Sequence, residues 1–111
     1  MIGEEEMSHY MLMFVGSEDR RDPNRVPAEV GKWWDENHAV IKSGARLDVT
    51  KNATTVRRVN GQMKVTDGPF IEAKEQVGGY CLVDVPDLDA AIRLAKSWPA
   101  GDVEVRPTVE R

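Results

Sequence analysis

Residues 9–16 read HYMLMFVG, a run in which nearly every side chain is apolar and polar positions do not alternate with apolar ones. This pattern predicts a strand that is covered on both of its faces. In a chain of 111 residues, helices can cover one face of a sheet, and a second copy of the sheet is the economical cover for the other. A domain this short also buries only about two thirds of its unfolded surface, which favours completion by a partner. We therefore expect a layered domain that forms a homodimer.

Two stretches farther along the chain have helical periodicity. Residues 26–44 keep their apolar positions on one helical face, and Gly44 is a suitable C-terminal stop. Residues 86–99 repeat apolar side chains at helical spacing, with Asp87 as the expected N-cap and Pro99 ending the helix. The apolar face predicted for the first helix consists of Val26, Val30, Trp33, Trp34, Ile41 and Gly44.

The other patterned segments predict strands. Residues 53–66 have β-branched runs on both sides of an Asn-Gly dipeptide, which best fits a two-residue type I′ turn, and they predict a hairpin. Residues 80–85 predict a strand that follows a flexible glycine pair. Residues 103–109 predict a final strand, in which Pro107 indicates an edge or a strand end. The order strand, helix, hairpin, strand, helix, strand predicts an α+β fold of the ferredoxin-like split β-α-β kind, with the hairpin added.

Bulk properties exclude several classes of function. Fifteen basic and 19 acidic residues give a net charge of −4 without a basic block, so nucleic acid is not an expected partner. No apolar run approaches the roughly 20 residues of a membrane span, and the start of the chain lacks signal-peptide features, so we expect a cytoplasmic protein that does not contact membranes. Residues 7–111 are expected to form one domain, preceded by a disordered extension at 1–6.

Few residue types suggest metal or cofactor chemistry. Cys81 is the single cysteine and is expected to be a small buried hydrophobe rather than a nucleophile. Two histidines and one cysteine show no metal-ligand spacing, and no glycine motif for phosphate is present. We expect neither a metal nor a cofactor.

The stretch TDGPFIEAKE, residues 66–75, combines a Gly-Pro pair, which favours a tight turn, with several charged side chains. A rigid Gly-Pro turn would hold Asp67 at a strand end, where its carboxylate could act as a base, an acid or the orienter of a histidine. Alternatively, Asp67 caps the turn with its own side chain. Glu72, Lys74 and Glu75 could bind a polar ligand or form exposed ion pairs with one another.

Three other residues could complete such a site. His38 can exchange protons near neutral pH, or it is an ordinary residue at a helix edge; His9 is expected at the surface. Tyr80 and Arg106 could line the same cleft, with Arg106 holding a carboxylate or phenolate through its fork of donors. Arg106 could equally pair with Glu104 or with an acid of a partner chain. The tryptophans are expected in the core or an interface.

Residues 65–95, VTDGPFIEAKEQVGGYCLVDVPDLDAAIRLA, together with VEVRPTVE at 103–110, resemble the DGPF group of the YCII-related family. The group is named for the motif at Asp67-Gly68-Pro69-Phe70. The resemblance implies a ferredoxin-like protomer that dimerises by packing sheet on sheet, in the manner of a dimeric α/β barrel, with a cleft between layers or subunits. Ala73 departs from the family pattern, which usually has Thr or Ser there.

The resemblance also implies a type of function. Members of the wider family often place an Asp and a His together in such a cleft, and some act on chlorinated aromatic compounds. The role of the DGPF group is largely unassigned, although its genes often accompany sigma factor genes. We therefore expect a cofactor-independent lyase or isomerase acting on a small anionic or aromatic molecule. Asp67 would be base or orienter, His38 the proton carrier, and Arg106 or Lys74 the anchor, with Tyr80 and Glu72 beside them.

Two alternatives remain open. The protein could be a non-catalytic module that binds a metabolite or has a regulatory role. It could also be a structural dimer in which the DGPF loop only closes the fold.

Overall fold

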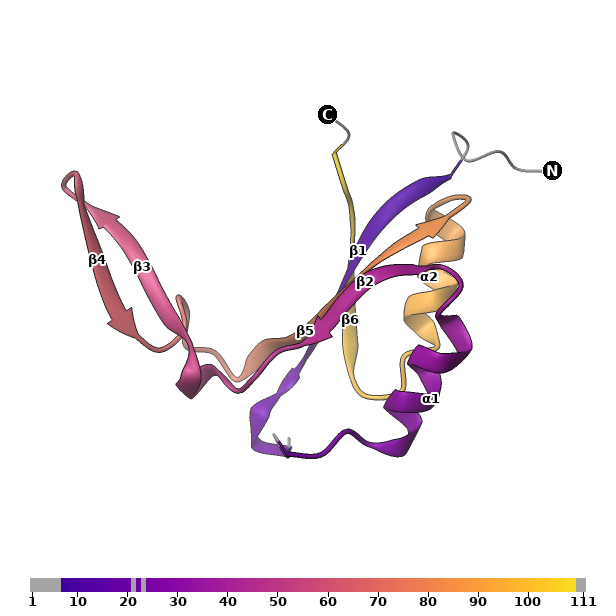
Figure 1. Ribbon diagram of the computed structural model, residues 1–111, viewed down its shortest axis with the longest axis horizontal. Helices are drawn as coiled ribbons and strands as arrows, with labels where there is room; N and C mark the ends of the chain where they lie inside the picture. Colours follow the sequence, from indigo (N-terminus) through magenta and orange to yellow (C-terminus); the bar gives the residue numbers. More distant parts are fainter. Residues whose placement is uncertain (1–6, 21, 23, 110–111) are drawn as a thin grey trace.

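The chain folds into a four-stranded antiparallel sheet, two α-helices and a separate two-stranded hairpin (Figure 1). A computed structural model describes residues 7–20, 22 and 24–109, so the extension expected at 1–6 lies outside the described residues. The elements are β1 (Ser8–Ser17), η2 (Glu18–Arg20), α1 (Ala28–Asn37), β2 (Ile41–Arg46), η3 (Thr50–Asn52), β3 (Thr54–Val59), β4 (Gln62–Asp67), β5 (Glu75–Val85), α2 (Leu88–Lys96) and β6 (Asp102–Pro107). The α+β class expected from the sequence is confirmed.

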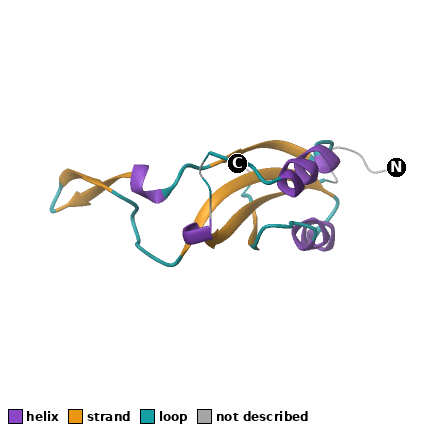
Figure 2. Ribbon diagram, turned by 90° about the horizontal axis from the view of Figure 1, so that it is seen from below, coloured by secondary structure: helices purple, strands orange, loops and turns teal. Residues whose placement is uncertain are grey.

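The strand order in the sheet is β2-β5-β1-β6, and every neighbouring pair is antiparallel. The strands that flank α1 are therefore separated by β5, and the strands that flank α2 are separated by β1. Both helices lie on one side of the sheet, and the β3–β4 hairpin projects at the opposite end of the molecule (Figures 1 and 2). One sheet face is thus covered by helices and the other is left open.

The core lies between the helices and one face of β1 and β5. Tyr10, Leu12 and Phe14 alternate along β1 as its buried positions, and Leu12 is fully buried. Phe14 stacks on Trp98 with ring centroids 3.8 Å apart and meets Trp33 edge-on at 5.6 Å. Aromatic pairs of this kind contribute about 0.5–1.5 kcal/mol beyond their buried area. The tryptophans therefore join α1 and the end of α2 to the sheet, as expected.

The predicted helix over residues 26–44 is wrong in its second half. Helix α1 ends at Asn37, and residues 41–46 form the edge strand β2, which pairs with β5. The apolar spacing continued past the helix end because Ile41 lies beside Val83 and Gly44 lies beside Cys81 in the sheet. A Cβ on Gly44 would lie 2.6 Å from the Tyr80 carbonyl oxygen, so glycine serves a close strand contact there and not a helix stop.

The strand predicted over residues 80–85 is longer than expected and begins at Glu75. The glycine pair belongs to this strand instead of forming a flexible entry to it. Phe14 lies opposite Gly79 while Val15 lies opposite Val77, so Gly78 is the extra residue of a bulge. A Cβ on Gly79 would lie 2.9 Å from the Ala45 carbonyl oxygen, which explains the second glycine.

Three other local predictions are confirmed. The hairpin turns at Asn60 and Gly61 with φ of 51° and 80°, as a type I′ turn requires. Asp87 caps α2, since the Ala90 N–H donates to its Oδ1 at 2.9 Å. Pro107 is the last residue of β6, an edge strand of the sheet.

Candidate functional site

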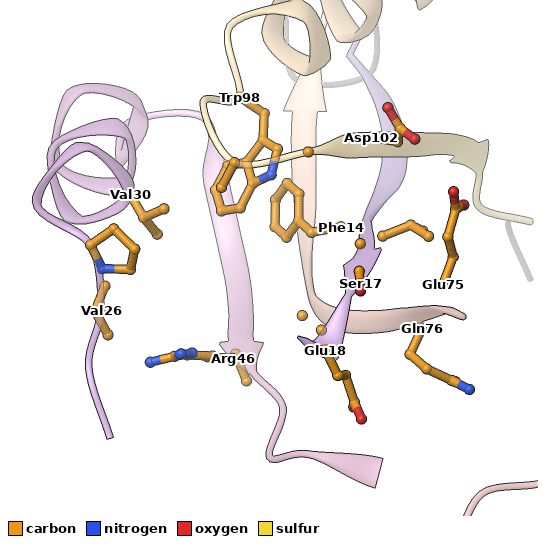
Figure 3. A pocket seen from close by; sticks show the side chains of 18 of the residues that line it. Phe14, Ser17, Glu18, Val26, Val30, Arg46, Glu75, Gln76, Trp98 and Asp102 are labelled. Atoms are coloured by element: carbon orange, nitrogen blue, oxygen red, sulfur yellow. The ribbon is translucent and has the colours of Figure 1, made fainter. Parts of the chain in front are cut away.

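A cavity of about 710 Å³ opens where β1, β2 and β5 meet the start of α1 and the loop that precedes β6 (Figure 3). Its inner wall is apolar and aromatic, with Phe14 and Trp98 stacked at the centre. Val26 and Val30 close the side toward α1. Small-molecule sites are typically concave, mostly apolar and about 300–1,000 Å³ in volume. The apolar lining residues are Phe14, Val15, Val26, Pro27, Val30, Trp34, Ala45, Trp98 and Ala100.

Local sequence explains why this space stays open. Phe14 is the last large residue on the helix side of β1, and Gly16 follows at the next position on that side. A Cβ placed on Gly16 would meet no atom within 4 Å. Gly79, opposite Phe14, adds no side chain either. The end of the sheet therefore lacks the side chains that would fill the space beneath α1.

Charged side chains surround the mouth of the cavity. Arg46 lies on the side of α1, whereas Glu75 and Asp102 lie on the other side (Figure 3). Arg46 Nη2 donates to the Asp22 carbonyl oxygen at 2.7 Å, and a guanidinium has further donors for an anion. The Glu18 carboxylate accepts from Thr50 N at 2.8 Å and from Thr50 Oγ1 at 2.7 Å, which ties η2, directly after β1, to η3.

The two residues predicted to be catalytic lie far apart. Asp67 ends β4 and is exposed, whereas His38 follows α1, and its Nδ1–H donates to the Asp35 carbonyl oxygen at 2.8 Å. β4 and α1 lie at opposite ends of the long axis of the molecule (Figure 1). Neither residue lines the cavity. One chain by itself does not bring Asp67 and His38 together.

Hydrogen bonds to and from its backbone, and not the Asp67 side chain, hold the DGPF turn. Gly68 N donates to the Ala53 carbonyl at 2.7 Å, and Thr55 Oγ1 donates to the Gly68 carbonyl at 2.7 Å. The Arg57 guanidinium lies 3.9 Å from the centroid of the Phe70 ring and donates to the Phe70 carbonyl. These contacts fix the strand end that carries Asp67. No hydrogen bond or ion pair joins the Asp67 carboxylate to the described part of the chain.

The remaining predicted binding residues divide between two surfaces. Tyr80 and Arg106 face the open side of the sheet, opposite Met13 and Met11 of β1. Arg106 pairs with Glu104, which was one of the alternatives left open. Glu72 and Lys74 are exposed in the loop before β5 and do not line the cavity. Their neighbour Glu75 does reach the cavity mouth.

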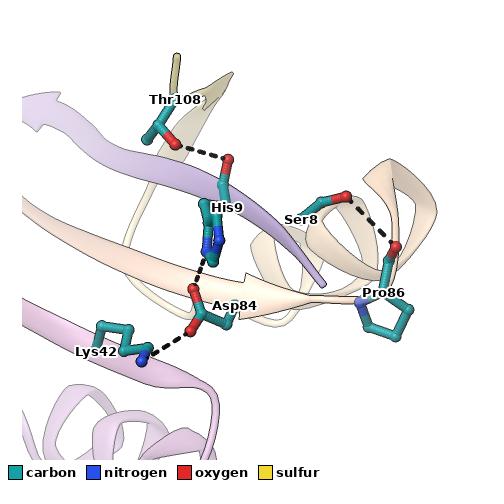
Figure 4. Close-up of polar contacts among 6 residues, drawn as sticks. All are labelled: Ser8, His9, Lys42, Asp84, Pro86 and Thr108. Carbon is teal, nitrogen blue, oxygen red and sulfur yellow. Dashed lines mark hydrogen bonds and ion pairs between the residues drawn. The ribbon is translucent and has the colours of Figure 1, made fainter. Parts of the chain in front are cut away.

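A His–Asp pair that sequence reasoning missed lies on the open sheet face. His9 of β1 hydrogen-bonds Asp84 of β5, and Lys42 Nζ approaches the same carboxylate at 3.2 Å (Figure 4). Burial alone would raise the pKa of Asp84, but the hydrogen bonds from His9 and Lys42 outweigh it and lower that pKa. The available signal was a histidine in the apolar stretch 9–16 and an aspartate in the apolar stretch 80–85. Antiparallel register placed the two side by side.

Cys81 is fully buried, as expected, and burial raises the pKa of its thiol to about 12. Among residues 7–20, 22 and 24–109, no three His, Cys, Asp or Glu side chains gather as metal ligands. Within the same ranges, no helix is long and apolar enough to cross a membrane.

The comparison with protein families adds to this geometry. The model of the YCII-related domain matches residues 10–110. The chain belongs to the YCII-related family. A curated protein of Rhizobium meliloti (strain 1021), described only as uncharacterized, is 43% identical to this YCII-related chain over 68 residues. The match covers 57% of the chain and 55% of that relative, so the chain spans about half of the relative's length.

Proposed function

We propose that this YCII-related protein binds a small molecule with an aromatic ring and an anionic group in the cavity beneath α1. The observation that carries the proposal is the 710 Å³ cavity, with Phe14 and Trp98 in its wall and Arg46 at its mouth. A ring would pack on the aromatic wall, and its anionic group would bind the remaining donors of Arg46, which lies on the α1 side of the mouth and opposite Glu75 and Asp102. Non-catalytic binding is the form of this function that we propose, because the cavity presents an aromatic wall and neither residue predicted to be catalytic, Asp67 or His38, lines it.

The ligand test uses a probe of matched chemistry. The anion 1-anilinonaphthalene-8-sulfonate and its uncharged analogue N-phenyl-1-naphthylamine share the same rings. Gly16→Leu would place a large side chain at the cavity wall, where its Cβ would meet no atom within 4 Å. We expect Gly16→Leu to abolish fluorescence enhancement by both probes. Gly31→Leu is the matched control, because Gly31 on α1 is equally unobstructed and does not line the cavity.

The role of Arg46 is tested with the same pair of probes. Arg46→Ala should weaken binding of the sulfonate by at least about tenfold, because a hydrogen bond to a charged group contributes about 1.5–3 kcal/mol. Binding of the uncharged analogue should not change. Arg93→Ala, on the exposed side of α2, should leave both affinities unchanged. Equal binding of both probes to Gly16→Leu and to the unsubstituted protein would exclude the cavity as the site.

We further propose that the protein forms a dimer. Each chain would have the ferredoxin-like fold, and the two copies would associate by packing the open sheet face of one on the open sheet face of the other. Met11, Met13 and Leu82 form an apolar stripe on this face, and no described element covers it. Burying such a stripe stabilises association by roughly 25 cal/mol per Å² of apolar surface. Sedimentation of the purified protein should give the mass of two chains, and Leu82→Lys should shift it toward one.

A second candidate is acid–base catalysis as a lyase or isomerase in a cleft between two copies. It is favoured by Asp67, whose strand end is held rigidly while its carboxylate has no partner among the described residues. A partner copy would have to supply His38, with Arg106, Lys74, Tyr80 or Glu72 as binding residues. For any substrate that is turned over, Asp67→Asn should lower kcat at least a hundredfold. Unchanged turnover by a folded Asp67→Asn protein would exclude this role.

A further inference from the structure

The β3–β4 hairpin, residues 54–67, is an arm with one uncovered apolar face. Its register places Val56 opposite Val65 and Arg58 opposite Met63, so these side chains share one face. Val56, Val65 and Met63 are 52%, 64% and 59% exposed. The opposite face carries the polar pairs Thr55–Thr66 and Arg57–Lys64. A two-stranded hairpin is at best marginally stable in water without a covered face.

The arm is held away from its own cavity. The loop before it is fixed by Leu47 N, which donates to the Gly78 carbonyl at 2.9 Å, and by the two bonds from Thr50 to Glu18. The loop after it is fixed by Gln76 Nε2, which donates to the carbonyls of Ile71 and Ala73 at 3.0 and 3.1 Å. The arm extends on the side of the sheet away from the helices (Figure 1). A second copy seated on the open sheet face would therefore lie next to it.

The arm could cover either of two surfaces on that copy, the open sheet face or the mouth of the cavity, and these two surfaces differ in charge. The arm has Arg57, Arg58 and Lys64 against Asp67, a net charge of +2. The open sheet face pairs Lys42 with Asp84 and Arg106 with Glu104, so its ionised pairs are balanced. The described residues around the cavity mouth are four acids and one base, a net charge of −3: Glu18, Asp19, Glu75, Asp102 and Arg46. Opposite charge favours the cavity mouth.

We infer that the arm is exchanged between subunits, and that each arm lies across the mouth of the cavity in the partner. The apolar face of the arm would close the opening, and Arg58, on the same face, would reach the acids around it. Because a two-fold dimer is reciprocal, each subunit gives one arm and receives one. The site proposed above would then be complete only in the dimer. This inference rests on the dimer of the proposed function and names what the partner contributes.

Cross-linking between differently substituted chains tests the exchange. One chain carries Met63→Cys on the apolar face of the arm, and a second, longer tagged chain carries Asp102→Cys at the cavity mouth. The mixed chains are treated with a short bismaleimide. Cys81 does not interfere, since it is fully buried. We expect a mixed-chain product in high yield. Gln62→Cys, the adjacent residue on the opposite face of the arm, should give at least fivefold less.

Each other outcome is informative. Linking of Met63→Cys to Met13→Cys, on the open sheet face, in place of Asp102→Cys would overturn the assignment to the cavity mouth. A product formed only within one chain that carries both Met63→Cys and Asp102→Cys would show closure by the chain's own arm and also overturn it. Absence of any mixed product would exclude exchange. If the unsubstituted protein bound neither probe while the cross-linking gave the expected product, the proposed ligand site would be rejected and the arm exchange would be retained.

Discussion

Replacement of Gly44 by alanine is a direct test of the way β2 joins the sheet. A Cβ at this position would lie 2.6 Å from the Tyr80 carbonyl oxygen, 2.8 Å from a ring carbon of Trp34 and 2.9 Å from the Cys81 Cβ. Favourable contacts between carbon atoms lie at about 3.5–4.0 Å. Two of these three neighbours belong to the backbone of β5 or to a fully buried side chain, so they cannot move aside without disturbing the strand pair.

We expect Gly44→Ala to lower the free energy of unfolding by about 3 kcal/mol, the upper part of the range for overpacked sites. For a domain of this size that corresponds to a fall in Tm on the order of 15 °C. The assay is urea and thermal unfolding followed by tryptophan fluorescence, because Trp34 reports on this contact. All variants must be compared at one chain concentration, since dimerisation would make Tm depend on concentration.

Gly31→Ala is the matched control. A Cβ on Gly31 meets no atom within 4 Å, and the residue lies within α1. Alanine should therefore stabilise the protein by up to about 1 kcal/mol through its helix propensity. If Gly44→Ala proved as stable as the unsubstituted protein, β2 could not pack against β5 and Trp34 as described, and the reasoning from close approach would be refuted.

Three further predictions concern single side chains. Asp84→Asn should lower the free energy of unfolding at neutral pH and should make that free energy depend less on pH in the acidic range. The folded-state pKa of Asp84 is lowered, so its stabilisation is present above the unfolded value of about 3.8 and is lost as the pH falls through the folded-state pKa; urea unfolding between pH 2 and 7 would show a constant difference if this were wrong. Cys81 should react with Ellman's reagent only after denaturation, because burial raises its pKa to about 12, and rapid native labelling would contradict this. Asp87→Ala should cost about 1 kcal/mol through loss of the cap on Ala90 N, whereas Asp89→Ala, also in the first turn of α2, should cost less; equal urea midpoints for the two would argue against the cap.

Local chemistry explains which parts of the fold were predictable. The Asn60-Gly61 turn and the Asp87 cap depend on neighbouring residues only, so their patterns predicted them correctly. Strand β2 was missed because an edge strand need not alternate, and Ile41 and Gly44 happened to continue the spacing of the preceding helix. The sequence pattern of a segment does not by itself show whether that segment will continue a helix or will pair with a strand that is distant in the sequence.

The candidate site shows the same division. The sequence by itself determined the family motif, the α+β class, a buried unreactive cysteine and the aromatic residues that form the core. Only the tertiary structure decided that His9 meets Asp84, that Phe14, Trp98 and Arg46 surround one cavity, and that Asp67 and His38 lie apart within a chain. The physical reason is range. Turns and caps depend on hydrogen bonds between residues a few positions apart. A cavity or an ion pair depends on strand register and on packing between distant segments, such as those of His9 and Asp84, which are 75 residues apart.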